Sequence, residues 1–141
     1  MPVEIVQLEP GGAGEFFRAT EREALKTFYD FSVVWHEQFH DLAALADGVT
    51  AGAVRLRIAA SLCHVEQLAV LPERRREGIG SELLERAADL AKYYNCHKMS
   101  ALVPHESAAQ RFFERCAYRQ EAVLPQHTFK LDVAVLRRFL L

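Results

Sequence analysis

Residues 68–91 read LAVLPERRREGIGSELLERAADLA, and this stretch decides the fold. Its first four residues are apolar and stop at Pro72, which is typical of the end of a strand. From Ile79 onward, apolar residues recur at every third or fourth position with charged residues between them, so a helix is predicted over 79–91. Gly78 and Gly80 therefore lie where a strand passes into a helix.

The loop between this strand and this helix has the features of an anion-binding site. Glycine has no Cβ, so a ligand can approach the backbone closely. Amides at a helix N-terminus lack partners within the helix and carry part of a positive charge. Three consecutive arginines at 74–76 add guanidinium groups suited to bidentate phosphate contacts. We therefore predict a phosphate-bearing ligand here, although a Gly-x-Gly pair by itself also fits a tight basic turn.

The rest of the chain predicts an α+β domain with a mixed sheet. Two predicted strands, at 39–46 and 52–58, flank Asp47-Gly48, a dipeptide that favours a tight hairpin turn, and apolar residues alternate with arginines in the second of them. A strand over 63–71, the helix over 79–91 and a strand over 98–103 form a parallel crossover unit. The other predicted elements are a strand at 3–8, a helix at 15–31, a helix capped by Ser107 and a last strand at 128–133. The prediction is one domain over 1–141, with antiparallel strands first and a parallel step after them.

The composition narrows the class of protein. The chain has 141 residues, a mass of 16.0 kDa and a net charge of -2, which fit one globular domain and do not favour nucleic acid as a partner. Neither a basic leader followed by an apolar run nor an apolar stretch of about 18 residues is present, so a cytoplasmic location without membrane contact is expected. Three cysteines without Cys-x-x-Cys spacing are expected to be free thiols.

Over residues 42–131 the sequence resembles the GNAT superfamily of N-acetyltransferases. The resemblance is carried by 68–72, by Arg75-x-x-Gly78-Ile79-Gly80 and by Leu83-Leu84. It implies a fold with the element order predicted above, acetyl-CoA as the acyl donor and no metal. The residues that it implies in cofactor binding are Leu68, Val70, Arg75, Arg76, Glu77, Gly78, Ile79, Gly80, Ser81, Glu106 and Phe113.

A second stretch, 106–118, resembles the family's later signature with three departures. Glu106 stands in place of an asparagine, Phe113 in place of a tyrosine and Ala117 in place of a glycine. Phenylalanine has no proton to give, so the general acid proposed at this position in the family is missing. His105 is a candidate replacement. A non-catalytic module that binds acetyl-CoA and regulates a partner is therefore an alternative function.

The resemblance implies direct transfer of the acetyl group to a primary amine, without a covalent enzyme intermediate. It places the backbone amide of Val70 at the thioester carbonyl. Strand alternation predicts that Glu66 and His64 lie on the same face as Leu68 and Val70, so each is a candidate catalytic base.

The acceptor is predicted only as a class, namely a small-molecule or peptide amine, and a homodimer is compatible with the sequence. Arg55 and Arg57 alternate with apolar residues in the predicted strand at 52–58. They favour an acidic acceptor, or they simply form the solvated face of that strand.

A competing motif is His36-Glu37-x-x-His40, the pattern of zinc metalloproteases. On one helix face, both histidines would reach the same zinc ion. On a strand they would stand about 13 Å apart, at ~3.3 Å per residue, which is too far for joint ligation. The aromatic and β-branched residues at 31–35 favour extended structure, so zinc proteolysis is the weaker alternative and no metal site is expected.

Overall fold

The computed structural model describes residues 2–29 and 36–140, and the chain forms two compact units, Met1–Trp35 and His36–Leu141. The first unit contains one helix, α1 (Gly14–Phe28). The predicted end of this helix at residue 31 lies outside the described residues, and a single domain over 1–141 stays a prediction. No helix in the described parts of the chain is both long enough and apolar enough to cross a bilayer.

The strand predicted at 3–8 is wrong, because this stretch has no regular secondary structure. Val3 and Ile5 are 83% and 88% exposed. A strand is stable only when a neighbour receives its backbone hydrogen bonds, and α1 within the same unit offers none. An apolar run is therefore not sufficient to form a strand here.

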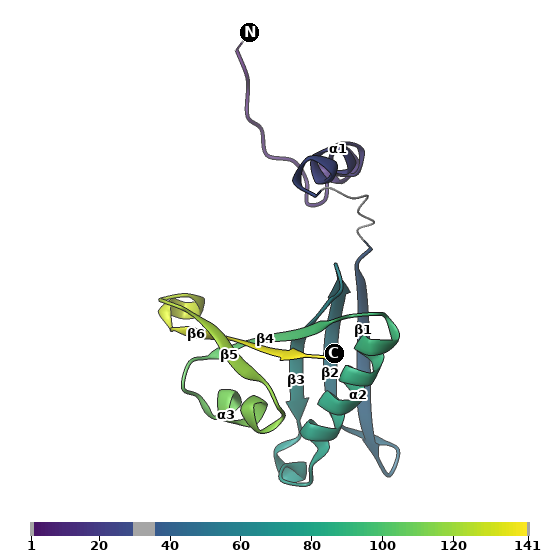
Figure 1. Ribbon diagram of the computed structural model, residues 1–141, viewed down its shortest axis with the longest axis vertical. Helices are drawn as coiled ribbons and strands as arrows, with labels where there is room; N and C mark the ends of the chain where they lie inside the picture. Colours follow the sequence, from purple (N-terminus) through teal and green to yellow (C-terminus); the bar gives the residue numbers. More distant parts are fainter. Residues whose placement is uncertain (1, 30–35, 141) are drawn as a thin grey trace. The chain divides into compact units, whose positions relative to one another are not determined.

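The second unit is built on one sheet of six strands. They are β1 (Gln38–Ala46), β2 (Val49–Ala59), β3 (Leu62–Val70), β4 (Lys98–Pro104), β5 (Arg119–Leu124) and β6 (Val133–Phe139). Their order in the sheet is β1-β2-β3-β4-β6-β5, and every neighbouring pair is antiparallel except β3 and β4 (Figure 1). This confirms the predicted mixed sheet, with antiparallel strands followed by a parallel step.

Helices α2 (Ile79–Tyr93) and α3 (Ala108–Arg115) pack on the same face of this sheet, here called the helical face. Leu84 of α2 is fully buried against it, and the ring of Phe113 from α3 lies 5.0 Å from that of Tyr118. Leu56 of β2 and Leu136 of β6 complete the core between them. Neighbouring residues in these strands, such as Arg57 and Arg137, point to the opposite face.

Local turn and capping signals in the sequence are confirmed. Asp47 and Gly48 both have positive φ, of 52° and 76°, in the hairpin between β1 and β2. The Ser107 hydroxyl accepts a hydrogen bond from the amide of Gln110 at 3.1 Å, as expected of the residue that caps α3. These signals act through the backbone of a few adjacent residues, so a sequence reveals them directly.

The strand predicted at 128–133 is wrong. Residues 128–130 form a single 3₁₀ turn in the connection between β5 and β6, where Phe129 has a φ of 53°. β5 itself carries a bulge at Glu121, which breaks the alternation that would have revealed it. The sequence analysis consequently missed both C-terminal strands.

The three cysteines are free thiols, as expected. Cys63 and Cys96 are buried, whereas Cys116 is partly exposed. Burial raises the pKa of the Cys63 thiol to about 12, so this thiol stays protonated and unreactive at neutral pH.

Candidate functional site

The parallel strands β3 and β4 separate after a short paired segment. Their register joins 62–65 with 98–101 and extends no further in the described structure. Beyond this point β4 turns away from β3, as Figure 1 shows, while β3 remains paired with β2 as far as Val70. Residues 66–70 therefore present a backbone edge that no strand covers in the described part of the chain, and we call this opening the split.

The amides of Leu68 and Val70 face the split. The amide of Leu71 donates to the carbonyl of Ala51 on β2 at 2.9 Å. Since backbone groups alternate in direction along an antiparallel strand, the N–H groups of Val70 and Leu68 point away from β2. The carbonyl of Val70 accepts a hydrogen bond from Nε of Arg75 at 3.2 Å, which links the strand to the arginine loop. The arrangement suits an extended ligand arm lying along β3.

The two glycines of the loop serve different purposes. Gly78 precedes α2 with a φ of 83°, and a Cβ there would meet no atom within 4 Å, so its open side is available to a ligand. A Cβ on Gly80 would meet Cζ of Phe112 at 2.9 Å, so this glycine allows α2 to pack closely on α3. The first regular helical bond at this end runs from the amide of Glu82 to the carbonyl of Gly78. The amides of residues 79–81 are therefore free to bind an anion.

A cavity of about 530 Å³ joins the split to this loop. Most of the residues predicted to bind the cofactor line it: Leu68, Val70, Arg75, Arg76, Gly78, Ile79, Gly80 and Ser81. Ala69, Arg74, Phe112 and Arg115 complete its wall. The structure thus brings the predicted strand, loop and helix start together around one space.

Arginines make this cavity strongly positive. Arg74 is paired with Glu77 at 3.4 Å, but Arg75, Arg76 and Arg115 have no carboxylate within 4 Å among the described residues. Sequence reasoning missed Arg115, although its place three residues after Phe112 puts both on one side of α3. Cations without acidic partners around free helix amides fit a pyrophosphate group.

Three residues expected at the cofactor lie elsewhere. Phe113 is 5% exposed and packs edge-on to Phe112 and Tyr118, because α3 turns Phe112 rather than Phe113 toward the loop. The side chain of Glu106 is 83% exposed, and its amide donates to Oε1 of Gln110. Glu77 faces a separate cavity, of about 620 Å³, between β1 and α2.

Neither Tyr118 nor His105 takes the place of the missing tyrosine in the cavity. The hydroxyl of Tyr118 is buried 3.6 Å from Sδ of Met99, and burial raises the pKa of this phenol far above neutral pH. His105 does not line the cavity, and its Nε2 lies 3.5 Å from Oε1 of Glu106. The proton for a leaving group must therefore come from elsewhere.

The expectation that His64 and Glu66 share a face with Leu68 is wrong. Val65 pairs with Leu56 and Gln67 pairs with Arg55, so Glu66 is the extra residue of a β-bulge. A bulge reverses the alternation of side chains along a strand. Residues 63 and 65 face the helices before it and residues 68 and 70 after it, whereas His64 and Glu66 point to the opposite face.

The two candidate bases differ in their partners. Oε1 of Glu66 accepts a hydrogen bond from Nε of Arg57 at 2.7 Å. Nδ1 of His64 lies 2.8 Å from the hydroxyl of Ser100 on β4. Burial, reinforced by nearby Arg57 and opposed by Glu66, holds the pKa of His64 below its ordinary value. His64 is therefore neutral at pH 7, and its Nε2 has no partner in the described structure.

The His-Glu-x-x-His stretch does not form a helix. His36 precedes β1 and His40 lies within it, with Nε2 at 3.0 Å from Oε1 of Gln38. The two histidines therefore lack the one-turn spacing of a zincin site. Among residues 2–29 and 36–140, no group of three or more His, Cys, Asp or Glu side chains is placed to hold a metal ion.

The sequence profile of the acetyltransferase (GNAT) family matches residues 7–118, whereas no curated protein matches the chain. The structure is similar to an acetyltransferase from Bacillus cereus ATCC 14579, with a TM-score of 0.76 and 18% identity over 96% of this chain and 97% of that one. It is also similar to the ribosomal-protein-S18-alanine N-acetyltransferase from Escherichia coli, with a TM-score of 0.67 and 15% identity over 96% and 92%. With sequence identities of 18% and 15%, the similarity to these two structures shows a shared fold and nothing further. The profile covers most of the sequence, and the chain therefore belongs to the acetyltransferase (GNAT) family.

Proposed function

We propose that the protein transfers the acetyl group of acetyl-CoA to a primary amine. One observation carries this proposal, namely the continuous cavity that joins the arginine-rich glycine loop to the split between β3 and β4. A ligand with a pyrophosphate at one end and an extended amide-containing arm at the other matches both parts of this cavity.

The donor is held by backbone and arginines together. The amides of residues 79–81 and the guanidinium groups of Arg75 and Arg76 receive the pyrophosphate. The pantetheine arm lies along 68–70 and bonds to the amides that face the split, much as a strand would. The thioester then lies near Val65, where pairing with β4 resumes.

His64 is the base that the geometry favours. The lone pair of a neutral amine attacks the thioester carbonyl carbon, the C–S bond breaks, and the sulfur leaves as a thiolate. The proton on the attacking nitrogen passes to Nε2 of His64, directly or through one water molecule. Glu66 is less suitable because its carboxylate is already bonded to Arg57. Of the two amides directed into the split, that of Leu68 lies nearer to this end of the arm than that of Val70, and we assign to it the stabilisation of the negative charge that develops on the carbonyl oxygen.

The thiolate of CoA can leave without a strong general acid. A thiol has an ordinary pKa of roughly 8.5, so a thiolate leaves without the strong acid that an amine would require. The missing tyrosine at Phe113 is therefore compatible with turnover. The structurally similar E. coli protein is named as an N-acetyltransferase of an alanine in a ribosomal protein. A peptide amine is therefore one class of acceptor to test beside small amines.

The absence of an acid in the described wall of the cavity favours a second candidate, a module that binds acetyl-CoA without turnover. The two candidates make the same prediction for binding and opposite predictions for release of free CoA. An assay of thiol release with a panel of amines separates them.

The test starts with a thermal-shift titration with acetyl-CoA. Ligand at 100 times its dissociation constant adds about 2.7 kcal/mol of stability, which corresponds to several degrees. Gly78→Trp fills the open side of the loop and should abolish the shift. Gly48→Trp is the matched control, because Gly48 also has a positive φ and open space around it but lies in the β1–β2 hairpin. No shift in the wild type, or an equal loss in both variants, contradicts the cofactor site.

A further inference from the structure

The opposite face of the sheet carries one residue from each of the six strands in a single register. Each residue in this row is paired with the next one across the sheet. From β1 to β5 the row reads Phe39, Arg57, His64, Ser100, Arg137 and Arg119. His64 and Ser100 lie at its centre, beside the split.

The end of this row consists of two arginines directly opposite each other, Arg119 on β5 and Arg137 on β6. Arg138, the next residue, reaches Glu85 of α2 at 2.8 Å on the helical face, which confirms that Arg137 points to the opposite face. Neither Arg119 nor Arg137 has a carboxylate within 4 Å in the described parts of the chain. The guanidinium of Arg137 stacks over the ring of Phe139 at 4.7 Å, which restricts where it can point.

The other arginines of this face are neutralised. Arg55 makes two hydrogen bonds to the carboxylate of Asp41, at 2.8 and 3.0 Å, and Arg57 is bonded to Glu66. An acidic acceptor would have to displace these pairs to use either arginine. The arginine pair of β5 and β6 has no such competitor in the described structure.

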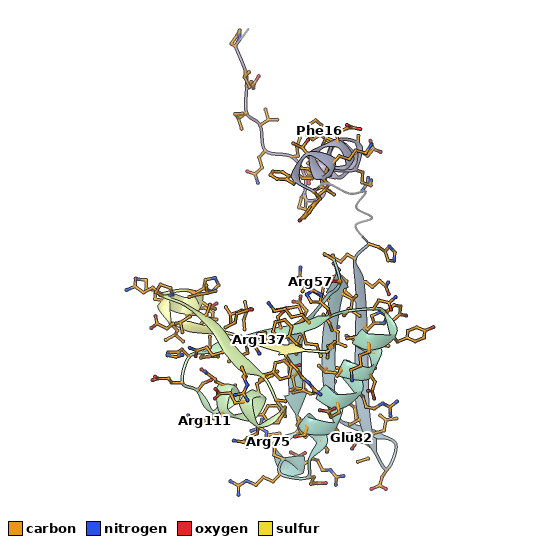
Figure 2. The ribbon with its side chains drawn as sticks, in the orientation of Figure 1. Phe16, Arg57, Arg75, Glu82, Arg111 and Arg137 are labelled. Atoms are coloured by element: carbon orange, nitrogen blue, oxygen red, sulfur yellow. The ribbon has the colours of Figure 1, made fainter. Side chains whose placement is uncertain are left out.

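Like charges directly opposite each other on a sheet destabilise it. An anion that bonds to both guanidinium groups removes this repulsion and gains charge-assisted hydrogen bonds. Ser100 separates Arg137 from His64, so the two side chains come from strands about 10 Å apart, at ~4.8 Å per strand spacing. In Figure 2, Arg57 and Arg137 lie farther up the sheet than Arg75 of the cofactor loop. The arginine pair is therefore separate from the pyrophosphate site.

Building on the proposed amine acetylation, we propose that the acceptor carries an anionic group in addition to its amine. The amine lies at His64, and the anionic group lies against Arg119 and Arg137. The shared chemistry is an oxyanion that accepts bidentate hydrogen bonds, which a carboxylate and a phosphate ester both offer. The spacing of the row requires a short linker between the amine and the anion, as in an ω-amino acid or an aminoalkyl phosphate.

Acetylation of matched acceptors tests this proposal. Hexylamine, 6-aminohexanoate and 3-aminopropyl phosphate are compared by kcat/KM with acetyl-CoA as donor. At least one anionic acceptor should exceed hexylamine by about 10-fold or more, the factor that one charge-assisted hydrogen bond provides. Arg137→Gln should remove this preference, whereas Arg55→Gln, an arginine of the same face bonded to Asp41, should keep it. Equal kcat/KM for all three acceptors, or a preference that survives Arg137→Gln, overturns the proposal.

A binding measurement decides the proposal when no acceptor turns over. Glutarate is titrated by thermal shift with the cofactor loop saturated by CoA, so that the dicarboxylate cannot occupy the loop. Wild type should be stabilised in a saturable manner, and the double variant Arg119→Gln/Arg137→Gln should not. Without glutarate the double variant should be as stable as wild type or more stable, because a repulsive pair has been removed. A wild type that glutarate does not stabilise contradicts the anion site, whereas a wild type that CoA does not stabilise contradicts the proposed function instead.

Discussion

The ring of His64 and the hydroxyl of Ser100 are joined by a 2.8 Å hydrogen bond across β3 and β4, the parallel pair of the sheet. This bond occupies Nδ1 of the histidine and directs Nε2 away from β4. It therefore holds the ring in one orientation beside the split, at the point where the thioester of the proposed donor would end.

Loss of this bond should lower turnover more than binding. We expect Ser100→Ala to reduce kcat by about 10- to 100-fold, the size of effect that a misplaced reacting group produces. KM for acetyl-CoA should stay unchanged because Ser100 does not line the cofactor cavity. Ser100→Thr keeps the hydroxyl and should restore most of the activity. Equal activity of the alanine and threonine variants would show that the hydrogen bond does not position the base.

His64 should set the acidic limb of the pH profile. Because burial lowers the pKa of His64 in the folded protein, kcat/KM should fall only below about pH 6.5, the ordinary histidine value. The free energy of unfolding should likewise decrease at low pH. The unfolded state binds a proton at His64 more readily than the folded state does. The contribution of neutral His64 to the free energy of unfolding is therefore complete above about pH 6.5, the ordinary histidine value, and is lost as the pH falls toward the lower pKa of the folded protein. His64→Gln should flatten both profiles, as measured by steady-state kinetics and by urea unfolding between pH 5 and 8.

Glu66 should be dispensable as a base. Its carboxylate already accepts a hydrogen bond from Arg57 at 2.7 Å, so Glu66→Gln should keep kcat within several-fold of wild type. His64→Gln should lose far more. A pH profile in which Glu66→Gln, and not His64→Gln, removes the acidic limb would assign the proton transfer to the bulge residue instead.

Arg115 should contribute to donor affinity although it is not among the residues predicted from the sequence to bind the cofactor. It lines the cofactor cavity without a carboxylate partner among the described residues. Arg115→Gln should weaken acetyl-CoA binding by about 10-fold or more, in line with one lost charge-assisted hydrogen bond. Arg111, on the same helix and labelled in Figure 2, is the control, because it bonds to the carbonyl of Glu106 and lies outside the cavity wall. Calorimetry at two salt concentrations should show the weaker salt dependence in Arg115→Gln alone.

Gly80→Ala should destabilise the fold through Phe112. The added Cβ would stand 2.9 Å from Cζ of that ring, and overpacking of this kind costs about 1–3 kcal/mol. Phe112→Leu in the same chain should recover part of the loss by making room, which a urea double-mutant cycle would measure. Additive effects of the two substitutions would show that the contact between α2 and α3 does not limit stability.

Local sequence signals determined the part of the fold around the arginine-rich glycine loop. The helical periodicity from Ile79, the Asp47-Gly48 turn and the Ser107 cap each depend on residues a few positions apart, and each prediction is confirmed. The glycines and arginines that line the 530 Å³ cavity could also be selected from the sequence, because a candidate anion site at a helix start occupies a short, continuous stretch of chain.

Tertiary structure alone decided which face the catalytic candidates occupy and which arginines are unpaired. The bulge at Glu66 exists only because β3 pairs with β2 in a particular register, and that register turns His64 away from the helices. The strand predicted at 3–8 failed for lack of a neighbour, and β5 and β6 escaped recognition because a bulge and a turn interrupt their pattern. Arg119 and Arg137 are 18 residues apart in sequence and opposite each other in the sheet. Strand pairing joins residues that are far apart in the sequence, and sequence periodicity predicts where a strand forms but not which strand it pairs with.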